Sequence, residues 1–239
     1  MADVIGPGGA AEGVADGTAS EAKLTDQAHQ ALLAQLRDGR LPSGMFLSMP
    51  MLVERLGFPM AAVREAVKRA EGPGLVTVLP KRGLMVMQAS PGMTRECLEL
   101  RALLDAEGAR RLIARGAEMP LADLRAAHLR LRDAAETAVT PEMQRRAILT
   151  DLSLHDLMAR GLGPGVMGRI YDENRDRIAV IQTQRPFLPD RIVSAMTEHL
   201  EIIAALEARD AEQAAEAIAQ HLRHTKRWWG VEQAGPEQG

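Results

Sequence analysis

The sequence has a single cysteine, Cys97, and aromatic residues make up only 3% of its 239 residues. One cysteine excludes a disulfide framework and a thiolate zinc site, and it fits the reducing cytoplasm. No apolar run approaches the roughly eighteen residues of a transmembrane helix. The N-terminal residues also lack the basic and apolar regions of a secretory signal. We therefore expect a cytoplasmic protein without a membrane segment.

Apolar residues make up 46% of the chain, which is enough for substantial cores built from Leu, Ile, Val, Ala and Met. The net charge of −3 is unevenly distributed, because residues 22–90 carry nine Lys and Arg against five Asp and Glu. The rest of the chain is acidic. This asymmetry indicates one part of the chain that meets phosphate and another that does not.

The N-terminal part has the pattern of a small DNA-binding domain. Residues 1–21 are rich in Gly and Ala without periodicity, which predicts a disordered arm. Amphipathic helices are expected over 23–39, 50–57 and 60–72. Two short apolar runs then flank the turn Pro80–Gly83, a hairpin pattern. Three helices followed by a hairpin predict a winged helix-turn-helix domain over residues 22–89.

After a linker near 89–93, only helices are indicated, so the protein is expected to be mainly α. Gly and Pro breaks separate six amphipathic segments, near 93–116, 120–138, 141–160, 164–184, 189–207 and 210–229. Long helices joined by short loops predict an antiparallel bundle of six or seven helices over residues 93–229. The last residues, 230–239, are expected to be a flexible tail.

Three of these helices place polar residues on their apolar faces. Steps of three and four residues put Asp151 and His155 between Ile148 and Met158. The same test puts His199 and His221 on the apolar stripes of the last two helices. Three buried imidazoles and one carboxylate need a consistent set of partners, and a divalent cation supplies one.

Taken one at a time, these residues do not require a metal, since a lone inward histidine is usually an ordinary hydrogen-bonded core residue. His224 lies one turn from His221 and is an alternative ligand. His29 and His128 are interpreted as surface or ordinary core residues, and Cys97 as a small buried hydrophobe. No further inward carboxylate is indicated, since Glu198 points in a different helical direction from His199.

The N-terminal block resembles the winged-helix domain of GntR-type bacterial regulators. The resemblance rests on the sequence "VREA" at 63–66, the "GLV" at 74–76 and the hairpin tip at 80–83. The C-terminal part is similar to the FCD domain of the FadR subfamily, whose metal motif is Asp-x-x-x-His followed by two distant histidines. Matching positions here are Asp151, His155, His199 and His221. The family's Glu-Leu-Arg run is matched by residues 99–101.

The resemblance implies a transcriptional regulator rather than an enzyme, with repression the expected effect. It implies a homodimer on a double-stranded DNA operator, contacted by Arg64, Lys81 and Arg82. It also implies a divalent metal (Zn²⁺, Ni²⁺ or Mn²⁺) and a small carboxylate effector held in part by Arg101.

The recognition helix departs from the family pattern. Where relatives carry Ser-Arg-Thr, this chain has Pro59, Met60 and Ala61, and Pro50 replaces an Arg of the preceding helix. Apolar side chains make only van der Waals contacts with base edges. Two other interpretations stay open from the residues alone: a metal-dependent hydrolase, and a metal sensor without an organic effector.

Overall fold

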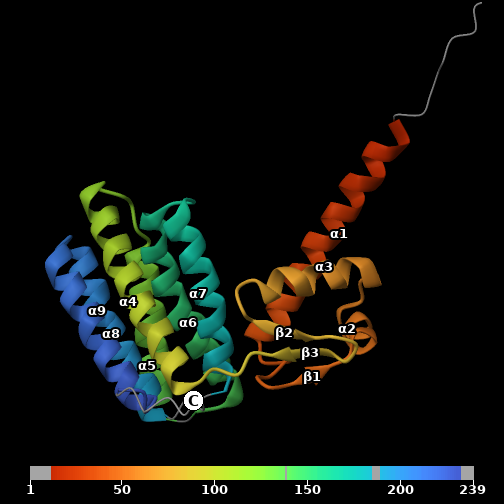
Figure 1. Cartoon of the computed structure of the whole chain (residues 1–239). Helices are drawn as coiled ribbons and strands as arrows, with labels where there is room; N and C mark the ends of the chain where they lie inside the picture. The colour runs from red at the N-terminus through yellow and green to blue at the C-terminus, as the bar shows by residue number, and fades with distance from the viewer. Residues whose placement is uncertain (1–11, 138, 185–188, 233–239) are drawn as a thin grey trace, which may run out of the picture. The chain divides into compact units, whose positions relative to one another are not determined.

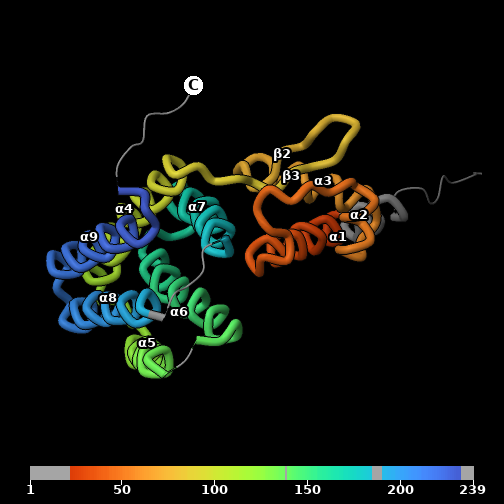
Figure 2. The backbone as a smooth tube through the Cα atoms, turned by 90° about the horizontal axis from the view of Figure 1, so that it is seen from below, coloured from red at the N-terminus to blue at the C-terminus, as the bar shows by residue number. Residues whose placement is uncertain are grey.

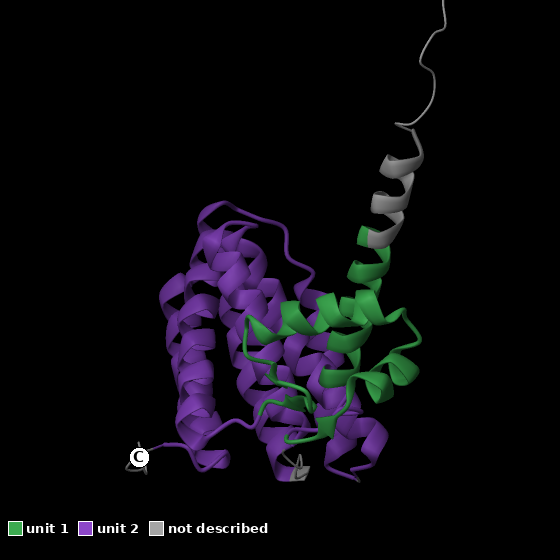
Figure 3. Cartoon of the chain, turned by 45° about the vertical axis from the view of Figure 1, so that its right-hand side comes forward, with its two compact units in different colours: residues 1–36, 44–87 green, residues 37–43, 88–239 purple. Residues whose placement is uncertain are grey.

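The computed structural model describes residues 12–137, 139–184 and 189–232. The chain divides into two compact units (Figure 3). Unit 1 contains residues 1–36 and 44–87, and unit 2 contains residues 37–43 and 88–239. The described helices and the small sheet give a mainly helical protein, as expected from the sequence.

Unit 1 is a winged helix-turn-helix domain. Its helices are α1 (Glu12–Arg37), α2 (Met49–Leu56) and α3 (Met60–Glu71) (Figure 1). Strands β2 (Val76–Leu79) and β3 (Gly83–Val86) form the predicted antiparallel hairpin. A third strand, β1 (Phe46–Leu47), pairs with β3 and gives the order β1-β3-β2. The sequence showed only a turn at β1, because two residues are too few for a strand period.

The core of unit 1 forms where α1, α3 and the sheet meet. Leu32 and Leu36 of α1, Val63 and Ala66 of α3, and Leu84 of β3 are fully buried. The side chain of Ser48 accepts a hydrogen bond from the backbone N–H of Met51 at the start of α2. Such caps satisfy backbone donors that the first helical turn leaves unpaired.

The predicted disordered arm, residues 1–21, is wrong for its second half. Helix α1 begins at Glu12 rather than near Lys23, and residues 1–11 lie outside the described part of the chain. Helix nucleation is costly but elongation adds one hydrogen bond for each residue fixed. A helix that starts in the packed segment after Lys23 therefore extends through weakly patterned residues that sequence periodicity does not mark.

Unit 2 is the predicted helical bundle, with six α-helices and one 3-10 turn in its described residues. The helices are α4 (Pro91–Ala114), α5 (Leu121–Ala135), α6 (Pro141–Ala159), α7 (Val166–Thr183), α8 (Pro189–Glu207) and α9 (Ala211–Trp228). The 3-10 turn η1 (Arg160–Leu162) follows α6. Helix α6 contacts the four helices α4, α5, α7 and α8 (Figure 2).

Two glycines bring α4 close to the end of α6. A Cβ atom on Gly108 would lie 2.1 Å from the carbonyl oxygen of Met158, and one on Gly161 would lie 2.0 Å from the carbonyl oxygen of Gly108. Only a residue without a side chain permits this approach. The contact sets the distance between α4 and α6, which both carry residues of the site described below.

Both ends of unit 2 differ from the prediction. Helix α4 begins at Pro91 with Ser90 as its cap, so residues 91–93 of the expected linker are helical. Val231 in the expected tail is 1% exposed, and its N–H donates to the carbonyl of Lys226. Residues 233–239 lie outside the described part. Among the described residues, no helix is long and apolar enough to cross a membrane.

Candidate functional site

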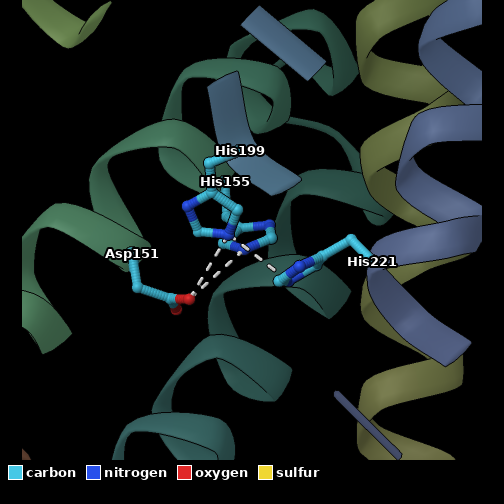
Figure 4. A group of neighbouring side chains, drawn as sticks. All are labelled: Asp151, His155, His199 and His221. Carbon is cyan, nitrogen blue, oxygen red and sulfur yellow. Dashed lines mark hydrogen bonds and ion pairs between the residues drawn. The ribbon is translucent and has the colours of Figure 1, made fainter. Parts of the chain in front are cut away.

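Asp151, His155, His199 and His221 converge inside the bundle from three helices (Figure 4). Asp151 and His155 lie one turn apart on α6, and the other two come from α8 and α9. Their candidate ligand atoms all lie within 4.8 Å of one another, and all four residues are buried. His199 Nε2 lies 3.3 Å from His221 Nε2 and 3.6 Å from an oxygen of Asp151.

Two further carboxylates hold the outer nitrogens of two of these histidines. His155 Nδ1 donates to Asp105 on α4 over 2.6 Å, and His221 Nδ1 donates to Glu198 on α8 over 2.6 Å. Asp105 is fully buried and Glu198 is 7% exposed. The prediction that no further carboxylate faces inward is therefore wrong. Asp105 follows Arg101 by one turn, a spacing that could have revealed it.

The third histidine has an imidazole as its outer partner. His128 on α5 is fully buried, and its Nε2 lies 3.2 Å from His199 Nδ1. Its other nitrogen, Nδ1, lies 2.7 Å from the carbonyl oxygen of Leu124. His128 belongs to this cluster rather than being an isolated surface or core residue. Its place in the apolar series Leu121, Leu124, His128, Leu131 was a sequence signal for burial.

Asp151 is held in its ionised form. Burial alone would raise the pKa of Asp151, but the positive charge of the Arg101 guanidinium lowers it well below the usual range. One carboxylate oxygen accepts hydrogen bonds from Gln182 at 2.9 Å and from Arg101 at 3.3 Å. The other oxygen faces His155 and His199 at 3.9 and 3.6 Å. Asp151 therefore offers a negative oxygen to the centre of the cluster.

The imidazoles are suited to bind a cation. Burial, then the neighbouring His221, lowers the pKa of His199, and burial, then Arg191, lowers the pKa of His221. Both rings are therefore neutral near pH 7, and an Nδ1 that donates outward leaves an electron lone pair on Nε2. His155 Nε2 is buried without a hydrogen-bond partner among the described residues. Converging lone pairs and a carboxylate oxygen fit a divalent metal ion.

The other predicted residues of unit 2 have clear positions. Arg101, which was predicted to help hold the effector, is 5% exposed and donates a hydrogen bond to Asp151. It therefore lies beside the cluster. His224 lies 3.2 Å from Glu198 and is outside the group of four. Cys97 is buried, as expected. In unit 1, the half-buried His29 lies 3.3 Å from the carbonyl oxygen of Ala66, an ordinary core contact.

A groove of about 610 Å³ in unit 1 brings together the cations predicted to contact DNA. Arg64 of α3 and Lys81 and Arg82 of the β2–β3 turn all line it. Lys68, one turn after Arg64, lines it as well and was not predicted as a site residue. The four cations are exposed, as phosphate-binding residues must be.

The start of α3 is apolar. Pro59 occupies the cap position without a side-chain hydrogen bond, Met60 is half-buried and Ala61 is exposed. Pro50 also lines the groove, where its ring offers no hydrogen bond. The start of α3 therefore offers no polar side chain at these three positions.

A winged helix-turn-helix unit joined to a helical unit is the architecture of a class of DNA-binding regulators. Comparison with known families gives a specific assignment. Residues 24–86 match the gntR family of bacterial regulatory proteins, and residues 96–224 match the FCD domain. The chain therefore belongs to the GntR family, with a C-terminal FCD domain. This is a family of regulators rather than enzymes, which argues against the hydrolase alternative.

The chain is also similar to individual proteins, in sequence to one and in fold to others. The chain is 30% identical over 99 residues to an uncharacterized HTH-type transcriptional regulator of Agrobacterium vitis, a match that spans 41% of this chain and 58% of that protein. The fold is similar to McbR/YncC of E. coli, with a TM-score of 0.72 and 21% identity over 86% of this chain and 96% of that one. It is also similar to a putative GntR regulator of Rhodococcus sp. RHA1, with a TM-score of 0.70 and 18% identity over 88% and 99%.

Proposed function

We propose that the protein is a cytoplasmic transcriptional repressor that binds an operator as a homodimer. A small organic acid, bound beside a divalent metal in unit 2, would modulate that binding. The observation that carries the proposal is the convergence of Asp151, His155, His199 and His221 within 4.8 Å, with Nε2 atoms facing inward. Zn²⁺, Ni²⁺ or Mn²⁺ suits this set of nitrogen and oxygen donors.

The residues around the cluster support an anionic effector. A divalent ion held there would supply positive charge and coordination positions for a carboxylate. Among the described residues, Arg101 makes one hydrogen bond, of 3.3 Å to Asp151, so other donors of its guanidinium remain for a second carboxylate. The effector would then lie between Arg101 and the ion. Its binding can change DNA affinity only if the two conformations of the protein bind it with different affinity.

The groove of unit 1 supports DNA binding. Arg64 on α3 would approach base edges in the major groove, and Lys81 and Arg82 at the wing would contact phosphates. Exposed Leu103 of α4 and exposed Val166 and Ile170 of the adjacent α7 support a subunit contact through unit 2. A two-fold dimer would present two wings to a palindromic operator.

Binding assays on the full chain test this function. Metal-free and Zn²⁺-, Ni²⁺- or Mn²⁺-loaded protein would be screened by thermal shift against a panel of small carboxylic acids. We expect an acid that raises the melting temperature of the metal-loaded form only. Footprinting on the DNA upstream of its gene, with and without that acid, should show protection that the acid weakens.

Arg101→Lys is a suitable control, because it keeps the charge but removes the planar guanidinium. The response to the acid should weaken in this variant while the metal stays bound. If metal stabilises the protein and no acid adds to that effect, the alternative of a metal sensor without an organic effector replaces the proposal. Absence of footprints under all conditions would contradict operator binding.

A further inference from the structure

The hydrogen bonds around the cluster fix which nitrogen of each imidazole carries a proton. A carboxylate or carbonyl oxygen in these contacts accepts, so the nitrogen facing it must donate. Asp105 therefore fixes His155, and Glu198 fixes His221, each with the proton on Nδ1. For His199 the partner is an imidazole, which can donate or accept, so its state depends on the next residue in the chain of contacts.

That next residue is His128, and its own partner resolves the ambiguity. The carbonyl oxygen of Leu124 lies 2.7 Å from His128 Nδ1, so this nitrogen donates. His128 is fully buried, an environment that favours an uncharged ring. A neutral ring with its proton on Nδ1 has a lone pair on Nε2, which then accepts from His199 Nδ1 at 3.2 Å. The lone pair of His199 Nε2 is left facing Asp151 and His221.

We propose that His128 is a positioning residue, which holds His199 in the tautomer and orientation that a metal ion at the cluster requires. The inference rests on the proposed metal binding by Asp151, His155, His199 and His221. The contacts run from the α5 backbone through His128 to His199 on α8. His128 itself stays outside the group of ligands and acts only through His199.

Without His128, the orientation of His199 would be poorly defined. Its ring could rotate, or its proton could move to Nε2 and face the other donors. Outer partners of ligand histidines commonly account for roughly 10- to 100-fold in metal affinity. The effect of His128 should be of that size, although its side chain touches no metal.

Two substitutions test separately the two hydrogen bonds of His128, one to the Leu124 carbonyl and one to His199. His128→Asn keeps a short amide that can donate to the Leu124 carbonyl but does not reach His199. His128→Gln places a carbonyl oxygen near the position of Nε2, where it can accept from His199. We expect the Asn variant to lose roughly 10- to 100-fold in Zn²⁺ affinity, measured by competition with a chromophoric chelator. The Gln variant should lose less than roughly tenfold in Zn²⁺ affinity.

His29→Asn is the matched control, since His29 also contacts a backbone carbonyl but has no second imidazole partner among the described contacts. Its Zn²⁺ affinity should equal that of the wild type. The visible spectrum of Co²⁺-loaded protein gives a second readout, and it should change in the Asn variant and not in the Gln variant. Equal affinities and spectra for the wild type, Asn and Gln forms would overturn the proposal.

The wild type alone provides a test that does not depend on a variant folding. In Zn²⁺-loaded protein with ¹⁵N-labelled histidine, the nitrogen resonances of His128 and His199 should show protonated Nδ1 atoms. The His199 Nε2 resonance should shift as a metal-bound nitrogen. A proton on His128 Nε2 would overturn the positioning role while leaving metal binding intact. Absence of Zn²⁺ binding by the wild type would instead contradict the proposed function itself.

Discussion

The two units carry their candidate functional residues in opposite environments. In unit 1, the groove cations Arg64, Lys81 and Arg82 are exposed, and none has an ion-pair partner among the described residues. In unit 2, the cluster around Asp151 is buried and each polar side chain is fixed by another. Substitutions in the groove should therefore change binding alone, whereas substitutions of the buried cluster residues should change stability and binding together.

The largest expected effect is on the packing that supports the cluster. In Gly108→Ala, the new Cβ would meet the Met158 carbonyl at 2.1 Å, so the backbones of α4 and α6 must separate. Such overpacking costs about 3 kcal/mol, and the melting temperature should fall by roughly 6–12 °C. Circular dichroism would measure this change. Gly165→Ala is the control, because no atom lies within 4 Å of its new Cβ, and an equal loss there would refute the explanation.

The groove should respond in affinity and not in stability. Arg64→Ala is expected to weaken operator binding by roughly 10- to 100-fold, because one base-directed arginine contributes about 1–3 kcal/mol. Its melting temperature should not change. Arg69→Ala on the same helix is the control, since Arg69 is paired with Asp26 at 2.6 Å within unit 1. Equal losses of DNA affinity in both variants would show only a general charge effect.

The buried histidines predict how the stability of the metal-free protein depends on pH. Because burial lowers the pKa of His199 and His221 in the folded state, only the unfolded state binds protons there below about pH 6.5. As the pH is lowered below this value, the free energy of unfolding should therefore decrease by about 1.4 kcal/mol per pH unit for each of these histidines. Burial raises the pKa of Glu198, which acts in the opposite direction at lower pH. Urea unfolding between pH 7 and 5.5 would test this, and a constant stability would contradict it.

The smallest effects are expected at the wing. Lys81→Ala and Arg82→Ala should each weaken binding to specific and random DNA alike, because phosphate contacts carry no sequence information. Each variant should lower the slope of log affinity against log salt concentration by about one. Fluorescence anisotropy at several salt concentrations would measure this slope. A loss confined to the operator sequence would instead assign the residue to base recognition.

Much of the architecture was predictable, because helix periodicity and Gly or Pro breaks are local signals. The wing, the bundle and the inward direction of Asp151, His155, His199 and His221 follow from such spacing. Strand β1 and the first turns of α1 were not predictable, since neither has a periodic pattern. The outer partners Asp105, His128 and Glu198 were missed because their roles depend on which helices pack together. His128 had the right spacing, but no local signal indicated that α5 would lie against α8.

Direct measurement of metal binding tests the central claim most directly. Metal-free full-length protein would be titrated with Zn²⁺ by calorimetry, beside Asp151→Ala and the control Asp156→Ala, whose carboxylate pairs with Arg175 outside the cluster. We expect one ion per chain for the wild type and Asp156→Ala, and loss of that binding in Asp151→Ala with the bundle still folded. No binding by the wild type, or unchanged binding in Asp151→Ala, would contradict the assignment of these residues as a metal site.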